Sequence, residues 1–156
     1  MRSVKLRPLV MLAGLCSWTL LTGCGGSNVV DVVLTPVTGK VTANGEPLSG
    51  AMITYAPYGQ QIGKPAYGMT DTDGNYELNF VDGRTGCPPG SYLVTISKFA
   101  QPDGSPFPAD MPAEQQTAVG MEHIPPEYSS PTQTKLLAEV KTETETIPFE
   151  ISLKKK

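Results

Sequence analysis

Two carboxylates in one short segment have the clearest potential for chemistry. Asp71 and Asp73 lie two positions apart in Asp-Thr-Asp-Gly, and such closely spaced carboxylates supply oxygen ligands at the start of calcium-binding loops. A complete loop of that type has a bidentate Glu at its twelfth position, where this sequence has Asp82 after an intervening strand-like segment. The same residues are typical of a tight turn. We therefore interpret the segment as a hairpin turn, with calcium binding through Asp71 and Asp73 as the weaker alternative.

The sequence has one histidine, His123, and its pattern does not favour catalysis. A zinc site needs more nitrogen and sulfur ligands than His123 and Cys87 together provide. Neither His-Glu-x-x-His nor Gly-x-Ser-x-Gly occurs, so a hydrolase built on His123 is a minor alternative. We interpret His123 as an exposed loop residue and Cys87 as a small buried residue, with a reactive or intermolecular thiol as the alternative. The prediction is a protein without catalytic residues and without a cofactor.

The first 23 residues have the organisation of an export signal. Arg2, Lys5 and Arg7 give a positively charged start, and residues 9–21 are mostly apolar. An apolar run of about 13 residues is shorter than the roughly 20 needed by a membrane-spanning helix, and it fits a secretory signal peptide.

The export signal ends in Leu-Thr-Gly-Cys at residues 21–24. This ending resembles the bacterial lipobox, in which an aliphatic residue and two small residues precede a cysteine. The resemblance implies cleavage between Gly23 and Cys24, a diacylglyceryl group on the Cys24 thiol and an acyl chain such as palmitate on the new amino terminus. Two or more acyl chains anchor a protein stably where one does not. Because Gly25 rather than Asp follows, the lipoprotein sorting pattern favours the outer membrane over the inner membrane.

The remaining composition limits the classes of partner. Removal of residues 1–23 leaves nine basic residues (12 less three) against 15 acidic ones, a formal charge of −6. That balance argues against nucleic acid as a partner. No later segment reaches 18 apolar residues, so the lipid on Cys24 is the expected membrane attachment. Cys16 leaves with the signal peptide and Cys24 takes the lipid, so Cys87 has no partner for an intramolecular disulfide.

Beyond a lipidated tether at residues 24–36, the hydrophobic pattern has a period of two, which is typical of β-strands with one buried face. The tether itself includes an apolar stretch at residues 29–34, which fits either an edge strand or a segment directed back to the membrane. The sequence has 16 Gly and 15 Pro, which favours short strands joined by turns over helices. The alternation runs through residues 37–42, 51–55, 67–70, 76–80, 92–97, 136–140 and 147–153. Seven such strands predict an all-β domain, a seven-stranded β-sandwich over residues 37–153.

Four segments in this order carry a family resemblance. They are Val-Thr-Gly-Lys-Val-Thr at 37–42, Gly-Glu-Pro-Leu-Ser-Gly-Ala at 45–51, Thr-Asp-Thr-Asp-Gly-Asn-Tyr at 70–76 and Pro-Gly-Ser-Tyr-Leu-Val-Thr at 89–95. Together they resemble the carboxypeptidase regulatory-like domain, and Ile-Pro-Pro-Glu-Tyr at 124–128 is similar to small bacterial lipoproteins that carry it. The resemblance implies a transthyretin-like (prealbumin-like) sandwich and a non-catalytic accessory or binding role. Its motifs are turn sequences, so they bear on fold more than on activity.

A long segment at residues 99–130 interrupts the strand pattern. It holds six prolines and scattered apolar residues without a regular period, which predicts an irregular flap over a sheet edge or face, with a binding role as the alternative. Tyr55, Tyr67, Tyr76 and Tyr92 fall at inward phases of their strands, so Tyr58 is left as the candidate for stacking on a sugar ring. Residues 154–156 are lysines and are interpreted as a solvated tail.

The leading functional hypothesis is a membrane-anchored cell-envelope lipoprotein whose β-sandwich has a structural role or binds an envelope protein or glycan. The alternative is a module that binds calcium or another small ligand. A hydrolase is the least favoured of the three.

Overall fold

The computed structural model describes residues 32–153, and these residues fold mainly as β-structure. The predicted all-β class is therefore confirmed. Gly23, Cys24, the signal peptide at 1–23, most of the 24–36 tether and the lysines at 154–156 lie outside the described residues. In the described part of the chain no helix is long and apolar enough to cross a bilayer.

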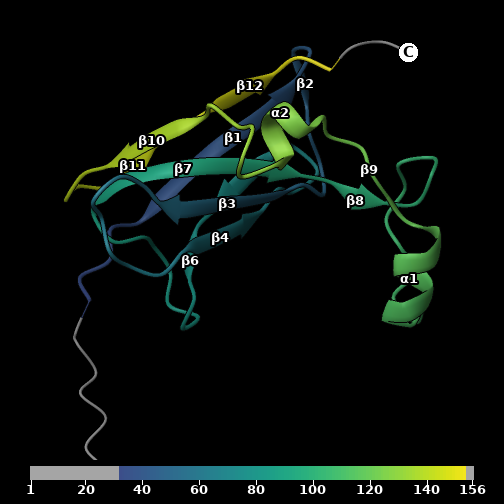
Figure 1. Cartoon of the computed structure of the whole chain (residues 1–156), viewed down its shortest axis with the longest axis horizontal. Coiled ribbons are helices and arrows are strands. Elements are labelled where there is room, and N and C mark those ends of the chain that lie inside the picture. Colours follow the sequence, from purple (N-terminus) through teal and green to yellow (C-terminus); the bar gives the residue numbers. More distant parts are fainter. Residues whose placement is uncertain (1–31, 154–156) are drawn as a thin grey trace, which may run out of the picture. The chain divides into compact units, whose positions relative to one another are not determined.

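Two five-stranded sheets make up most of the domain (Figure 1). The first is built around β1 (Val37–Ala43), with β11 (Glu145–Thr146) and β12 (Phe149–Ile151) parallel to it and β2 (Glu46–Pro47) and β5 (Asn75–Glu77) antiparallel.

The second sheet has the order β10-β7-β3-β4-β6, and all its neighbouring strands are antiparallel. Its strands are β3 (Met52–Pro57), β4 (Ala66–Met69), β6 (Asn79–Phe80), β7 (Gly90–Ser97) and β10 (Leu137–Val140). All seven predicted ranges contain a strand. The described residues nevertheless form twelve strands, because short pairings were not visible in the pattern and because one predicted strand is divided.

The divided strand is the predicted segment 76–80. Its alternation is unbroken, yet Glu77 pairs with β1 in the first sheet, whereas Asn79 pairs with β4 in the second. The switch occurs at Leu78, which is fully buried and donates its backbone N–H to the Val37 carbonyl. A segment that crosses between sheets keeps its period of two, so hydrophobicity alone could not show the crossing.

One hydrophobic core is shared by the two sheets. It contains Val37 and Val41 of β1 together with inward residues of the second sheet such as Ile53, Val94 and Ile96, all fully buried. Because alternate residues of each strand point to this core, each sheet keeps one buried face and one solvated face.

The prediction for β4 was wrong in phase. Tyr67 was placed at an inward position, but it is 39% exposed, and Met69 is also exposed, whereas Ala66 and Gly68 point into the core. Gly68 has no room for a side chain, because a Cβ there would lie 2.7 Å from the Glu77 carbonyl oxygen. The small residues thus face inward in this strand, and the large ones face solvent.

Folded structure also begins earlier than residue 37. Thr35 and Cys87 exchange two backbone hydrogen bonds of 2.9 Å, and the Thr35 hydroxyl donates to the Lys141 carbonyl. The last residues of the predicted tether are therefore attached to the domain as an isolated β-bridge.

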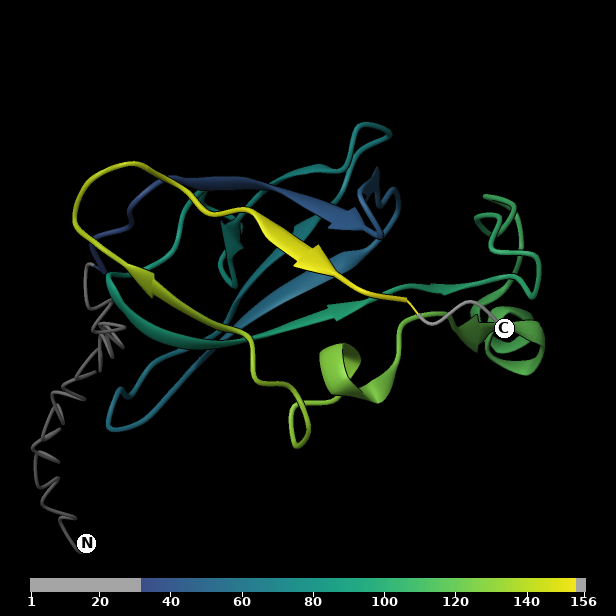
Figure 2. The same ribbon diagram turned by 90° about the horizontal axis from the view of Figure 1, so that it is seen from above.

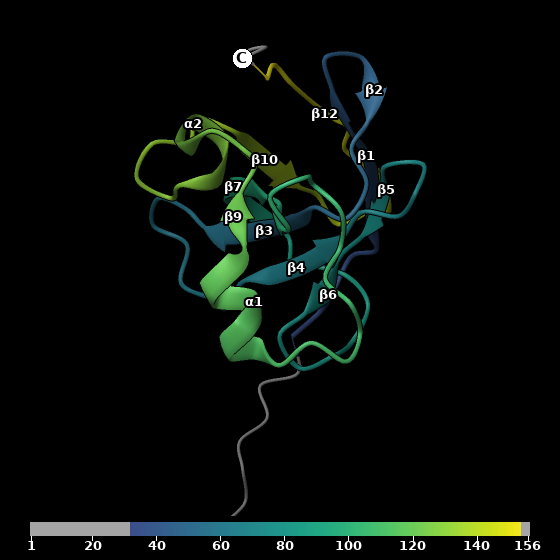
Figure 3. The same ribbon diagram turned by 90° about the vertical axis from the view of Figure 1, so that its right-hand side faces the viewer.

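Residues 99–130 contain more regular structure than predicted. After β8 (Phe99–Ala100) come helix α1 (Ala113–Val119), β9 (Met121–Glu122), which pairs with β8, and helix α2 (Pro126–Ser129). Neither helix has a buried residue, so neither has the apolar stripe that would have revealed it. Residues 98–125, here called the lobe, follow β7 and extend beyond the two sheets (Figure 1), so that α1 lies in front of the sheets in the end-on view of Figure 3.

The connections between strands lie at two opposite ends of the domain, as the directions of the strands require (Figure 2). The proximal end, where β1 begins, carries residues 32–36, 58–65, 81–89 and 141–144. The distal end carries residues 44–50, the turn at 71–75 and the lobe.

Candidate binding groove

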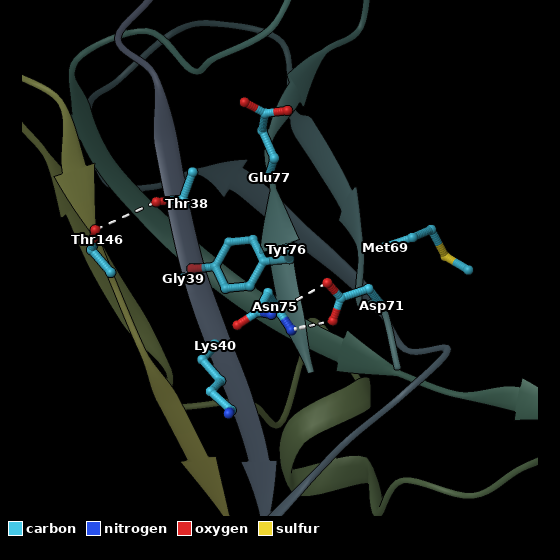
Figure 4. Close-up of a pocket in the computed structure, with 9 residues that line it drawn as sticks. All are labelled: Thr38, Gly39, Lys40, Met69, Asp71, Asn75, Tyr76, Glu77 and Thr146. Atoms are coloured by element: carbon cyan, nitrogen blue, oxygen red, sulfur yellow. Dashed lines mark hydrogen bonds between the residues drawn. The ribbon is translucent and has the colours of Figure 1, made fainter. Parts of the chain in front are cut away.

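The turn at Asp71 is closed by its own carboxylate (Figure 4). One carboxylate oxygen of Asp71 accepts hydrogen bonds from the backbone N–H groups of Asp73 (2.9 Å) and Asn75 (2.8 Å), and the other accepts one from the Asn75 side chain (3.3 Å). Donation from Asn75 and Asp73 holds the pKa of Asp71 below its usual range. Because these oxygens already serve the loop's own donors, the geometry supports the interpretation of the segment as a tight turn. The prediction of a hairpin was wrong, because β4 and β5, which the turn joins, pair with different partners in different sheets. In residues 32–153, no three Asp, Glu, His or Cys side chains converge as metal ligands would.

A shallow depression adjoins this turn on the outer side of the first sheet (Figure 4). Its rim consists of separate polar side chains from neighbouring strands, among them Lys40, Glu77 and Thr146. Its base is Gly39 beside the Tyr76 ring, whose hydroxyl donates to the Ile147 carbonyl at 2.6 Å. The polar group at the base is thus already used in a hydrogen bond that stabilises the sheet. We therefore do not place the binding function there.

His123 and Cys87 lie far apart in the fold and do not form a catalytic pair. His123 is partly buried in the lobe rather than exposed as predicted, and its Nε2 lies 2.7 Å from the Gln101 carbonyl oxygen. Cys87 is fully buried, as predicted, and burial raises the pKa of its thiol to about 11. A thiol with a raised pKa forms little thiolate and is a poor nucleophile at neutral pH.

Among residues 32–153, the two most exposed aromatic side chains lie at opposite ends of the domain. Tyr58, the predicted stacking candidate, is 50% exposed at the proximal end, and Phe99 is 48% exposed at the distal end. Phe99 is one of the scattered apolar residues of the long segment at 99–130, which was predicted to fold as a flap over a sheet edge or face. The structure instead leaves its ring half in solvent.

Phe99 forms one side of a groove between the lobe and the second sheet. Its ring lies 5.7 Å from the Phe107 ring at an angle of 44°. Both rings pack on Gly120, where a Cβ would approach each of them to 2.6 Å. Glycine at position 120 is therefore what allows the two rings to lie close together.

The groove has a volume of about 370 Å³ and a mostly apolar lining. It is bounded by the 49–50 connection and Met69 on the sheet side, and by Phe99, the 104–109 loop and Gln116 on the lobe side. Pro106 and Pro108 lie in that loop, and a backbone of this kind has few N–H groups with which to bind polar ligands. This lining suits apolar side chains better than a hydroxyl-rich ligand.

Glu122 holds the lobe against the end of β7. Its carboxylate accepts hydrogen bonds from the Ser97 hydroxyl and from the backbone N–H groups of Lys98 and Ile124. Ile124, two residues later, is buried in the main core. The lobe is thus fixed at its base, while its outer part is held by local turns and α1.

Comparison of the sequence with known protein families and with curated proteins identified no relative. No family model matches the sequence, and no curated protein matches it. Among solved structures, a 9R-lipoxygenase from Cyanothece PCC8801 is similar with a TM-score of 0.38 and 12% identity. The similarity covers 78% of this chain and 16% of the lipoxygenase chain, so this chain spans only a small part of that protein's length. A likeness this weak carries no argument about fold or function.

Proposed function

We propose that this chain is an exported lipoprotein, cut before Cys24 and held at a membrane by lipid on that residue, whose domain binds another envelope component without catalysis. The export signal at residues 1–23 and the Leu-Thr-Gly-Cys ending support the anchor. The sorting pattern at Gly25 supports the outer membrane as its location.

The domain is a β-sandwich of the transthyretin type in this proposal. Two observations support it. One is the single core shared by the two sheets. The other is that the positive-φ glycines of the four quoted segments all lie in connections or at a strand end, at Gly45, Gly50, Gly74 and Gly90. Such modules usually position a binding surface and have no catalytic residues of their own.

The single observation that carries the binding function is the distal groove, with a half-exposed Phe99 at the end opposite to the tether. The ligand that fits best is an extended protein segment with apolar side chains. The lobe also has four acidic residues and one lysine between residues 98 and 125, so basic residues flanking the apolar segment would complement its charge.

Affinity capture from envelope fractions tests this function. The full chain is expected to retain a partner that the Phe99→Ser variant loses, because Phe99 lines the groove and its aromatic side chain is half exposed. Leu137→Ser is the matched control, since Leu137 is 58% exposed on β10, away from the groove.

Three outcomes would contradict the proposal. Two results of the capture would exclude the groove as the binding site: repeated captures that recover no partner, or a partner that the Phe99→Ser variant retains equally well. Calorimetric heat from a glycan panel or from calcium that is lost in Asp73→Ala would favour the small-ligand module instead. An unmodified Cys24 in the mass spectrum of the membrane fraction would remove the anchor.

A further inference from the structure

The proximal end has exposed apolar side chains of its own, which the distal groove does not use. Its segments include four exposed apolar side chains, those of Val33, Tyr58, Ile62 and Val81. The Ile62 side chain is 100% exposed. Full exposure of a branched aliphatic side chain at a loop tip gives no packing benefit to the fold. One exposed apolar side chain is ordinary, but four of them on segments at one end of the domain favour contact with a further surface.

The 58–65 loop is held in position from its inner side. The Gln61 side chain donates to the Tyr92 hydroxyl at 2.9 Å, and this hydroxyl donates to the Pro88 carbonyl at 2.7 Å. The backbone N–H of Tyr58 donates to the Ser91 carbonyl at 3.0 Å. Because Gln61 is tied inward, its neighbour Ile62 is directed outward from a fixed base.

The same base is joined to the start of the folded chain. Cys87, next to Pro88, pairs with Thr35, and the Arg84 guanidinium donates to the Val32 carbonyl at 3.2 Å. The 58–65 loop and the point where the tether reaches the domain therefore belong to one end of the molecule (Figure 2).

Chain length limits how far this end can lie from the lipid. Cys24 and Val32 are eight residues apart, and eight residues span at most about 28 Å when fully extended. A lipid on Cys24 would thus keep the proximal end near the membrane surface.

Charge points to the same orientation. The 58–65 loop contains Lys64 and no acidic residue, whereas the distal lobe has four acidic residues and one lysine. Tyrosine and lysine are typical of the boundary between lipid and water, where an aromatic ring or an alkyl stem can be buried while the polar group stays hydrated.

We propose that the 58–65 loop contacts the membrane that carries the anchor, with Ile62 entering the head-group region and Tyr58 and Lys64 at its boundary. This inference rests on the lipid anchor proposed above. It also orients the domain, so that the distal groove faces away from the membrane, toward partners in the surrounding space.

The test uses the full lipidated chain, purified from membranes and reconstituted in vesicles of phosphatidylethanolamine and phosphatidylglycerol. An environment-sensitive fluorophore is placed at Gln60→Cys, an exposed position beside Ile62, and in a second protein at Ala118→Cys, an exposed position on α1. Cys87 is fully buried and the Cys24 thiol is blocked by lipid in the proposed form, so the label is confined to the introduced cysteine.

The expected result is a blue shift and quenching by spin-labelled lipid at position 60 and neither effect at position 118. Adding Ile62→Asp should abolish the signal at position 60 without changing the unfolding temperature, since Ile62 has no buried surface to lose. An unshifted label at position 60 on chains that sediment with vesicles would overturn the membrane contact and leave the anchor intact. Chains that neither sediment nor carry lipid on Cys24 would overturn both.

Discussion

The core shared by the two sheets and the lobe at residues 98–125 differ in what holds them together. In the core, Tyr55 and Tyr76 share a hydrogen bond of 3.0 Å, and Tyr76 also reaches the Ile147 carbonyl, so residues far apart in sequence are joined inside the domain. In the lobe, bonds such as Gln101 to Ser105 and Gln116 to Met111 join residues four or five apart. Together with the β8–β9 pairing and the contact of His123 with the Gln101 carbonyl, which also stay within residues 98–125, these bonds order the lobe without depending on the sheets. It can therefore expose Phe99 and line a groove at little cost to the fold.

The largest effect is expected at Gly39 in the core. A Cβ at this position would lie 2.1 Å from the Ile147 carbonyl oxygen and 2.5 Å from the Tyr76 ring, so Gly39→Ala should cost about 3–5 kcal/mol of stability. Gly63→Ala is the control, because its Cβ would meet its nearest neighbour, in Pro57, at an ordinary 3.6 Å. Urea unfolding of both variants decides the matter. Equal midpoints would show that the neighbours of β1 within the first sheet shift aside easily, contrary to the comparison.

The next effect concerns the tyrosine pair. Tyr76→Phe removes the donor to the Ile147 carbonyl and leaves the Tyr55 hydroxyl without that partner inside the core, which should cost about 1–3 kcal/mol. Tyr67→Phe, at an exposed position on β4, should change the unfolding midpoint little. A similar small loss in both variants would mean that the hydroxyl network contributes no more than a surface tyrosine does.

A third effect links the core to pH. Burial raises the pKa of Cys87 from 9.0 to about 11, and burial likewise raises the pKa of Tyr76 to about 12. A group whose pKa is raised in the folded state binds more protons there than in the unfolded state, so the stability it contributes is complete below pH 9 and is lost toward pH 11.

The unfolding midpoint should therefore fall as the pH rises from 9 to 11. In the Cys87→Ala variant the midpoint should fall less steeply with pH. Cys87 should account for about 2 kcal/mol or less of the unfolding free energy that is lost over this pH range. Native Cys87 should also resist iodoacetamide at pH 8. Rapid alkylation of the folded chain would show that the proximal end opens more readily than its buried bridge indicates.

The contrast between core and lobe also explains how far the sequence could predict the molecule. The alternation of residues 92–97 predicted β7, because one-sided burial leaves a period of two. Cys87 was correctly expected to be buried for a different reason, because a free cysteine behaves as a small apolar residue. Tyr67 was misplaced because Ala66 and Gly68, the inward residues of β4, are too small to mark a buried face.

The groove could not be predicted, because it depends on Phe99 and Phe107 meeting over Gly120, a contact without periodicity. One signal was available for α1. Its sequence Ala-Glu-Gln-Gln-Thr-Ala-Val is rich in good helix formers and follows Pro112, although its apolar residues form no stripe. High helix propensity without an apolar stripe predicts a helix that does not pack its side chains into the core. This agrees with the structure, in which α1 has no buried residue.

The smallest effect on global stability is expected at the joint between the two regions. Glu122→Ala removes the acceptor for the Ser97 hydroxyl and for the backbone N–H groups of Lys98 and Ile124, which attach the lobe to β7. The core should keep its unfolding midpoint nearly unchanged, because its strands and the tyrosine pair remain. Amide exchange should instead rise across the lobe, and limited proteolysis should begin there.

Glu114→Ala serves as the control for Glu122→Ala, since Glu114 is exposed in the first turn of α1 and removing it changes the lobe's charge equally. If Glu122→Ala lowered the global midpoint as much as Tyr76→Phe does, the lobe would have to be counted as part of the core. The separation between a region that stabilises the fold and a region that presents a groove would then be lost.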